Sequence, residues 1–174
     1  DLISLGNDNY TTKNRSFVYV IKPKVLELGE YKFENIETTY DGKSHYPEFV
    51  GDLPEGVSKT IMYLSDYVAV GTHLACVEFK VTNPNYKLDK TNKLQATVTI
   101  NPKPILVSFE NLELVEDGTQ KDIKVSFVGT LSSNFDGYKK VYSSTPIRAG
   151  KYTLTIVLNP NSNYVILQDN VFEF

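Results

Sequence analysis

The chain of 174 residues contains no tryptophan, one cysteine, one methionine and two histidines. Because Cys76 is the only thiol, no disulfide can form within the chain. A zinc site built from several thiolates is excluded for the same reason. A small domain without disulfides or structural metal must derive its stability from its hydrophobic core.

Positive charge and long apolar runs are also scarce. The 18 Lys and Arg are outnumbered by 21 Asp and Glu, so the formal net charge is −3. We therefore expect no nucleic-acid partner, since phosphate backbones attract proteins through a cationic field. No window approaches the roughly 18 apolar residues of a transmembrane helix, and the first residues lack the pattern of a signal peptide. We expect no transmembrane segment in this chain and any signal or anchor to lie outside it.

The sequence is rich in residues that favour strands. It has 12 Tyr and 9 Phe together with many Val, Ile and Thr. Apolar and polar residues alternate in segments 123–127 and 152–156, as in strands with one buried face. No window of about 11 residues sustains the apolar spacing of a helix. The sequence predicts an all-β fold, and turn signals at intervals of about 8 to 12 residues favour a sandwich or a partly open barrel.

An internal repeat with a period of about 78 residues organises the chain. Five landmarks recur in the same order with small drift in length. These are Asp41-Gly42 with Asp117-Gly118, Phe49-Val50-Gly51 with Phe127-Val128-Gly129, Gly71 with Gly150, Asn85-Tyr86 with Asn163-Tyr164, and Pro23 with Pro102; Asn9-Tyr10 lies one period before Asn85-Tyr86.

The repeat predicts two tandem domains. Residues 24–103 form the first unit, and residues 104–174 form a second unit that is cut near its last strand. Residues 1–23 are either the end of a preceding repeat or the first strand of the first domain, because a repeat can be permuted. Pro102-Lys103-Pro104 lies at the junction, where two prolines restrict the backbone. We expect a monomeric, extended rod.

The two Asp-Gly pairs are predicted to lie at hairpin tips. A type I′ turn requires positive φ at both central residues, which Gly adopts freely and Asp tolerates better than most residues. Asp41-Gly42 and Asp117-Gly118 have the sequence typical of such turns.

Several motifs of the first unit resemble a known family. They are Thr39-Tyr40-Asp41-Gly42-Lys43, Val50-Gly51-Asp52-Leu53-Pro54-Glu55-Gly56-Val57, Gly71-Thr72, Asn85-Tyr86, and Ala96-Thr97-Val98-Thr99-Ile100 with Pro102-Lys103. The first unit is similar to MBG-type repeats, a bacterial immunoglobulin-like class of cell-surface proteins. The second unit departs from this pattern, since Glu116 precedes its Asp-Gly pair where the family has Tyr and Leu131-Ser132-Ser133 replaces the Leu-Pro-Glu-Gly turn.

The resemblance implies both a fold and a role. The fold is a pair of small immunoglobulin-like β-sandwiches, with a β-grasp-like sheet as the alternative. The role is that of a non-catalytic spacer or stalk in an extracellular, surface or secreted protein. An adhesive module that binds a glycan or a host protein through loops or a tyrosine-rich patch is the rival. The family motif consists of turns and core positions, so it implies no catalytic residue.

The residues most often used in catalysis show no convergent pattern. His45 and His73 lie in different segments, and His73 occupies the position of Tyr152 in the second unit. Cys76 is out of phase with Ala75 and Val77, and no base lies near it in the sequence. We therefore interpret both histidines and the cysteine as ordinary strand or surface residues, and we predict that the chain is not an enzyme.

Binding candidates are equally weak. Asn7-Asp8-Asn9 and the Asp41/Asp52 or Asp117/Asp122 carboxylates could contribute to a calcium site, yet no contiguous calcium loop is present. We interpret them as turn residues and predict no metal and no cofactor. Asn9-Tyr10-Thr11 and Asn14-Arg15-Ser16 match glycosylation sequons. Four tyrosines are candidates for an exposed binding patch: Tyr63, Tyr67, Tyr138 and Tyr142.

Overall fold

The structure is a computed structural model that describes residues 16–88, 92–110, 113–129, 131, 135, 137–160 and 162–174. The predicted all-β class is confirmed. In the described residues, helical structure is limited to the 3-10 turn η1 (Leu28–Glu30), and no helix there could cross a membrane. The strands are β1 (Lys24–Leu26), β2 (Lys32–Phe33), β3 (Ile36–Thr39), β4 (Phe49–Val50), β5 (Val57–Tyr63), β6 (Gly71–Val81), β7 (Tyr86–Leu88), β8 (Lys93–Asn101), β9 (Lys103–Glu110), β10 (Lys124–Val128), β11 (Tyr138–Tyr142), β12 (Thr153–Leu158), β13 (Tyr164–Ile166) and β14 (Val171–Glu173).

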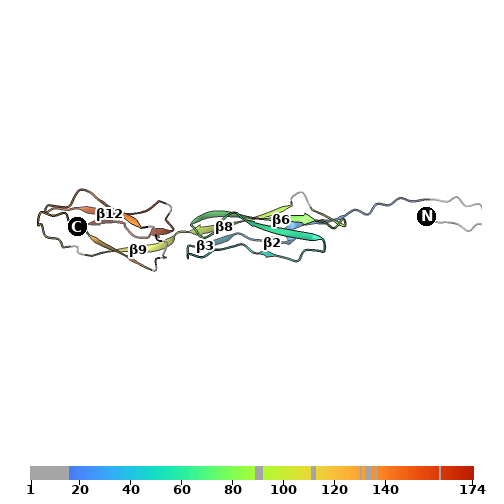
Figure 1. The fold of residues 1–174 in the computed structure, drawn as a ribbon, viewed down its shortest axis with the longest axis horizontal. Helices are drawn as coiled ribbons and strands as arrows, with labels where there is room; N and C mark the ends of the chain where they lie inside the picture. The colour runs from blue at the N-terminus through green and yellow to red at the C-terminus, as the bar shows by residue number, and fades with distance from the viewer. Residues whose placement is uncertain are drawn as a thin grey trace, which may run out of the picture.

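The strands lie in two groups along the long axis of the molecule (Figure 1). Strands β1 to β8 belong to the first unit, and their largest sheet has the order β3-β8-β6-β5. Strands β9 to β14 belong to the second unit, in sheets ordered β10-β9-β13 and β11-β12-β14. β9 begins at Lys103, which the sequence assigned to the first unit.

Equivalent backbone pairings recur in the two units. β1 runs parallel to β7 with Lys24 opposite Tyr86, and β9 runs parallel to β13 with Lys103 opposite Tyr164. Each parallel pair begins with a hydrogen bond of the same kind. The Lys24 amide donates to the carbonyl of Asn85 at 2.8 Å, and the Lys103 amide donates to the carbonyl of Asn163 at 2.9 Å.

Asp117-Gly118 lies in the loop that connects the antiparallel strands β9 and β10, as the hairpin prediction requires, whereas that prediction is wrong for Asp41-Gly42. β3, which precedes Asp41-Gly42, pairs with β8 in parallel, whereas β4, the next strand, pairs with β2. The chain therefore changes sheets at this loop. Among the described non-glycine residues only Tyr67 has positive φ, so Asp41 lacks the backbone of a type I′ turn. Its Oδ1 accepts a hydrogen bond from the Lys43 amide at 2.9 Å instead.

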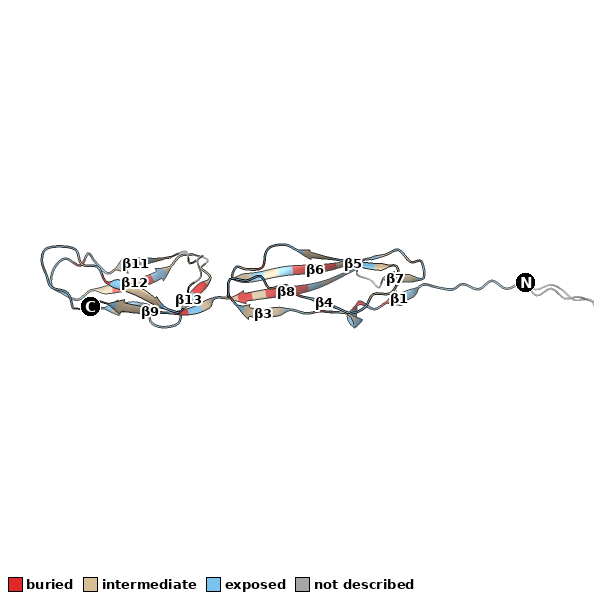
Figure 2. Ribbon diagram, turned by 60° about the horizontal axis from the view of Figure 1, so that its bottom comes forward, coloured by how far each residue is buried: buried red, intermediate tan, exposed pale blue. Residues whose placement is uncertain are grey.

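The buried residues form two clusters (Figure 2). The first lies mainly on the inward faces of β6 and β8, where alternate side chains such as Val77 and Val98 are buried. The second is smaller, with a buried set of Val107, Ile123, Leu154 and Ile156. The first cluster also includes Ile105 and Tyr164 of the second unit. The two groups of strands are therefore packed against each other where they meet.

Residues 16–23 form no strand. They run from β1 as an extended exposed segment (Figure 1), and Lys24 is the first described residue with a strand partner.

Candidate functional site

The histidines and the cysteine do not converge. His45 Nε2 lies 2.9 Å from Asp41 Oδ1, whereas His73 contacts the Ser65 hydroxyl at 3.2 Å. Cys76 is half-buried and accepts a hydrogen bond from the Gln95 amide at 3.4 Å. These three side chains thus make separate local contacts. Neither histidine is the hydrogen-bond partner of the Cys76 thiol in these contacts.

Two of the carboxylates considered as calcium ligands, Asp41 and Asp117, accept hydrogen bonds within their own turns. Within the described part of the chain, no group of three or more His, Cys, Asp or Glu side chains could hold a metal ion. Asn7-Asp8-Asn9 and the two sequons at Asn9 and Asn14 lie outside the described residues. Asp41 and Asp117 are turn residues, as the sequence indicated.

In both turns the aspartate contacts a side-chain nitrogen of the residue four positions later. Asp41 pairs with His45, and Asp117 pairs with Lys121 at 2.5 Å between Nζ and Oδ1. Hydrogen bonds from His45 and Lys43 hold the pKa of Asp41 below its usual range. Bonds from Lys121 and Thr119 lower the pKa of Asp117 in the same way. Closure of each loop explains why the contact recurs in the two turns, and it requires no ligand.

The four candidate tyrosines differ in their exposure and packing. Tyr67 is fully buried, and Tyr138 packs edge-on against Phe127 with ring centroids 4.9 Å apart. Tyr63 is 41% exposed and lies beside Tyr46, with ring centroids 4.7 Å apart. Burial raises the pKa of Tyr63, and the neighbouring tyrosines Tyr67 and Tyr46 raise it further. Only Tyr46 and Tyr63 therefore remain as an accessible aromatic pair.

Tyr142 belongs to a polar network. Its hydroxyl accepts a hydrogen bond from the Ile123 amide at 3.1 Å and also contacts Asp122. Lys140 Nζ lies 2.7 Å from Asp122 Oδ2 and donates to the Ile123 carbonyl at 2.6 Å. The Lys140 bond, followed by the Tyr142 bond, holds the pKa of Asp122 below its usual range. This network ties the start of β10 to β11.

Asp122→Asn is expected to flatten the acid dependence of stability. A carboxyl whose pKa is lower in the folded than in the unfolded state stabilises the fold above its unfolded pKa, and this stabilisation is lost as the pH falls through the folded value. Because the Asp122 side chain is 66% exposed, the loss should stay below about 1 kcal/mol. Urea midpoints at about pH 7 and pH 3 measure it. Asp169→Asn, at another exposed carboxylate, is the control. If both variants show the same change in urea midpoint between pH 7 and pH 3, the stabilising role given to Asp122 is wrong.

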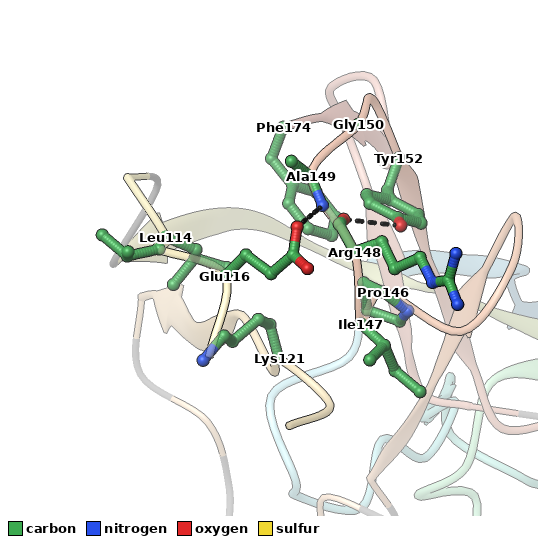
Figure 3. A pocket seen from close by; sticks show the side chains of 11 residues that line it. Leu114, Glu116, Lys121, Pro146, Ile147, Arg148, Ala149, Gly150, Tyr152 and Phe174 are labelled. Atoms are coloured by element: carbon green, nitrogen blue, oxygen red, sulfur yellow. Dashed lines mark hydrogen bonds between the residues drawn. The ribbon is translucent and has the colours of Figure 1, made fainter. Parts of the chain in front are cut away.

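A small concavity lies between loops of the second unit, and Figure 3 shows the side chains that line it. It has a volume of about 190 Å³ and is lined by residues 114–116, Lys121, residues 146–150, Tyr152 and Phe174. Glu116 Oε2 accepts a hydrogen bond from the Ala149 amide at 2.8 Å, and the Tyr152 hydroxyl donates to the Arg148 carbonyl at 2.8 Å. These polar groups are bonded to the pocket wall, so they do not converge on a reacting atom. The sequence analysis did not identify this pocket.

The junction between the units is the second feature that the sequence indicated only partly. One residue, Pro102, separates β8 from β9. The rings of Tyr40 and Tyr164 meet edge-on with centroids 5.6 Å apart. The Val70 amide donates to Asn163 Oδ1 at 2.9 Å. The junction therefore combines a one-residue connection between two strands with an aromatic contact and a hydrogen bond between the units.

Three comparisons with known proteins add no relative. A scan against family models, a search of curated proteins and a search of solved structures each gave no match.

Proposed function

We propose that the chain is a non-catalytic tandem repeat that acts as a spacer in an extracellular bacterial surface or secreted protein. In this proposal the two units are small immunoglobulin-like β-sandwich domains of the MBG-type class. The motif resemblance supports the extracellular setting, and antibody labelling of intact source cells tests it. Staining only after permeabilisation would contradict that setting.

The observation that carries the spacer role is the short, packed junction. A spacer must resist bending, and a linker of one proline between two strands has few free torsions. The Tyr40–Tyr164 ring contact and the bond from Val70 to Asn163 would each have to break for the units to bend apart. These contacts restrict the motion of one unit relative to the other, whereas a flexible linker would leave the units free to move.

The strand composition supports the sandwich over the β-grasp alternative. A β-grasp sheet packs on a helix, whereas helical structure in the described residues amounts to the three-residue turn η1. The parallel pairs β1-β7 and β9-β13 begin each unit in the same way, which supports division of the chain near Pro102.

Small-angle X-ray scattering tests the rod. We expect the wild-type chain at low concentration to scatter as an elongated particle. Insertion of Gly-Ser-Gly-Ser between Asn101 and Pro102 should broaden the distribution of intramolecular distances, because it separates β8 from β9. The same insertion between Asp117 and Gly118, in an exposed loop, is the control. A wild-type profile as broad as that of the junction insertion would overturn the spacer role.

The adhesive alternative depends on one observation. Tyr46 and Tyr63 are each 41% exposed, and their tilted rings have centroids 4.7 Å apart. Leu64, the next residue after Tyr63, is 74% exposed. Tyrosine rings offer apolar area with a polar edge, which suits sugars and protein partners. A glycan array with wild-type protein should be blank under the spacer proposal. Reproducible binding that Tyr46→Ala abolishes would favour adhesion.

A further inference from the structure

The chain enters and leaves the first unit at opposite ends. It enters at β1 and leaves at the end of β8, from which one residue leads into β9. The segment before β1 and the second unit lie at opposite ends of the first unit, along the long axis (Figure 1). A pull on the chain from both sides of the first unit therefore acts along this axis, between Lys24 and Asn101.

The entering strands pair in parallel with the leaving strands. β1 lies beside β7, which precedes β8 in the chain, and β3 lies beside β8 itself. In the β3–β8 pair, Ile36 is opposite Val98 and Thr39 is opposite Asn101. When the chain is pulled, β3 is drawn back toward the entry while β8 is drawn toward the junction. The two strands are thus pulled along their length in opposite directions.

This geometry loads the hydrogen bonds between the strands together. The bonds of a ladder lie across the strand direction or slant between the strands. Sliding one strand along the other strains every bond of the ladder at once, whereas separating two strands from one end breaks the bonds one after another. A parallel pair between the entry and the exit of a domain therefore resists extension more strongly than an antiparallel pair that is opened from its end.

Further hydrogen bonds reinforce the β3–β8 pair at both ends. Before β3, Asn35 Oδ1 accepts a bond from the Thr97 amide at 2.8 Å. After β3, the Tyr40 amide donates to the Asn101 carbonyl at 2.8 Å, and the Asn101 side-chain amide donates to Glu37 Oε1 at 2.9 Å. Asn101 is the last residue of β8. The residue through which a pull leaves the first unit is therefore bonded twice to β3 and the residue after it.

β8 is also held on its other side. It lies between β3 and β6 in the four-stranded sheet, and its antiparallel register with β6 runs from Glu78 opposite Lys93 to Gly71 opposite Ile100. The inward side chains of both strands belong to the first buried cluster. The strand that carries a pull to the junction therefore cannot slide without breaking contacts on both of its edges.

The second unit receives a pull in the same geometry. β9 follows β8 after one residue and pairs in parallel with β13. The Lys103 amide donates to the Asn163 carbonyl at 2.9 Å where this pair begins. The Leu167 amide donates to the Ile105 carbonyl at 3.2 Å just after the pair ends. A pull that leaves the first unit thus meets another parallel pair at once.

We propose that the chain bears tension along its long axis, and that the parallel β3–β8 pair is the element that resists extension of the first unit. This inference rests on the proposed function, since a spacer carries any pull between the parts that it separates. The property concerned is a different one. The packed junction resists bending, whereas the β3–β8 pair resists stretching.

Optical tweezers applied to the full chain measure this resistance. Cys76→Ser first removes the one native thiol, so that introduced cysteines alone carry the DNA handles. For the lengthwise pull, Lys22→Cys and Pro104→Cys place the handles at exposed positions on either side of the first unit. The load then enters before β1 and leaves just after β8.

A pull in another direction is the reference. Glu55→Cys and Pro84→Cys lie at exposed positions beside the end of the β5–β6 pair where Val57 is opposite Val81. A pull between them opens this antiparallel pair from its end. At equal force, we expect the lengthwise pull to unfold the first unit at least about tenfold more slowly, because several hydrogen bonds must break together. Equal rates in the two directions would overturn the proposal.

A pair of variants tests the assignment to β3–β8. Asn35→Ala should raise the rate of unfolding under the lengthwise pull at least about threefold, because it removes the acceptor of the Thr97 amide. Thr82→Val is the matched control, since the Thr82 hydroxyl donates to the Gly56 carbonyl at 3.0 Å, away from β3 and β8. It should change this rate by less than about twofold.

Equal effects of the two variants on the lengthwise pull would show that β3–β8 is not the resisting element and would overturn the proposal. Chemical denaturation without load provides the comparison, because each variant loses one side-chain bond to a backbone group. A difference between the variants that is confined to the loaded measurement supports the proposal. The scattering experiment measures shape without load, so the spacer role and the resistance to stretching can fail independently.

Discussion

Tyr67→Ala is expected to lower the free energy of unfolding by about 3 to 5 kcal/mol, the usual range for deletion of a buried aromatic ring. Tyr67 is fully buried, although it lies in the loop between β5 and β6. Its ring packs against those of Tyr46, Tyr63 and His73, with centroids 5.5, 5.8 and 5.2 Å away. The alanine variant would leave a cavity at this end of the first unit.

The hydroxyl of Tyr67 contributes separately. It donates to the Leu74 carbonyl at 2.5 Å and accepts from the Leu64 amide at 3.1 Å. Tyr67→Phe should therefore cost about 1 to 3 kcal/mol, because it leaves two backbone groups without this partner. Backbone strain does not confuse the comparison. Tyr67 has φ of 48°, which costs Phe and Ala about as much as Tyr because each has a Cβ.

Chemical denaturation of the three proteins measures both effects. Tyr63→Ala is the control, since its ring is in the same cluster but 41% exposed. We expect the order of destabilisation to be Tyr67→Ala, then Tyr67→Phe and Tyr63→Ala, with the first clearly largest. If Tyr67→Ala and Tyr63→Ala lower the free energy of unfolding by the same amount, the buried position of Tyr67 would be wrong.

The sequence was sufficient for the strands that have one buried face. Alternation in 152–156 predicted β12, and the even spacing of Ala75, Val77 and Phe79 predicted the buried face of β6. The reason is physical: a period of two in apolar residues has no other common explanation. It also set Cys76 on the face opposite to these residues, where it contacts Gln95.

Features that depend on distant partners were not predictable. Asp41-Gly42 has the residues of a hairpin turn, yet the flanking strands pair with different neighbours. Tyr67 follows Ser65 and Asp66, so its local sequence is that of an exposed loop. The pocket is lined by residues 114–116, residues 146–150 and Phe174, which are far apart in the sequence, so no local pattern reveals it.

Leu154→Ala is expected to open the second unit while the first stays folded. Leu154 is fully buried, and among the described residues its cluster has three other buried members, Val107, Ile123 and Ile156. Deleting a buried leucine side chain typically costs about 2.7 to 5 kcal/mol, which is a large part of the stability of a domain of this size. The first cluster has its own buried residues on β6 and β8, and Leu154 is not among its members, although Phe127 and Ile166 pack against both clusters.

Hydrogen exchange in increasing urea locates the effect. Amides of β11 and β12 should lose protection in Leu154→Ala, whereas those of β6 and β8 should keep it. Val157→Ala is the control because Val157 lies on the same strand and is 43% exposed.

The junction limits the independence of the units, since Ile105 and Tyr164 pack in the first cluster. When the second unit opens and these two side chains leave the first cluster, amide protection should fall near Tyr40. Protection at the centre of β6 should not change. Loss of protection throughout β6 and β8 at the same urea concentration would mean that the two units are one cooperative body, and the division of the chain near Pro102 would be wrong.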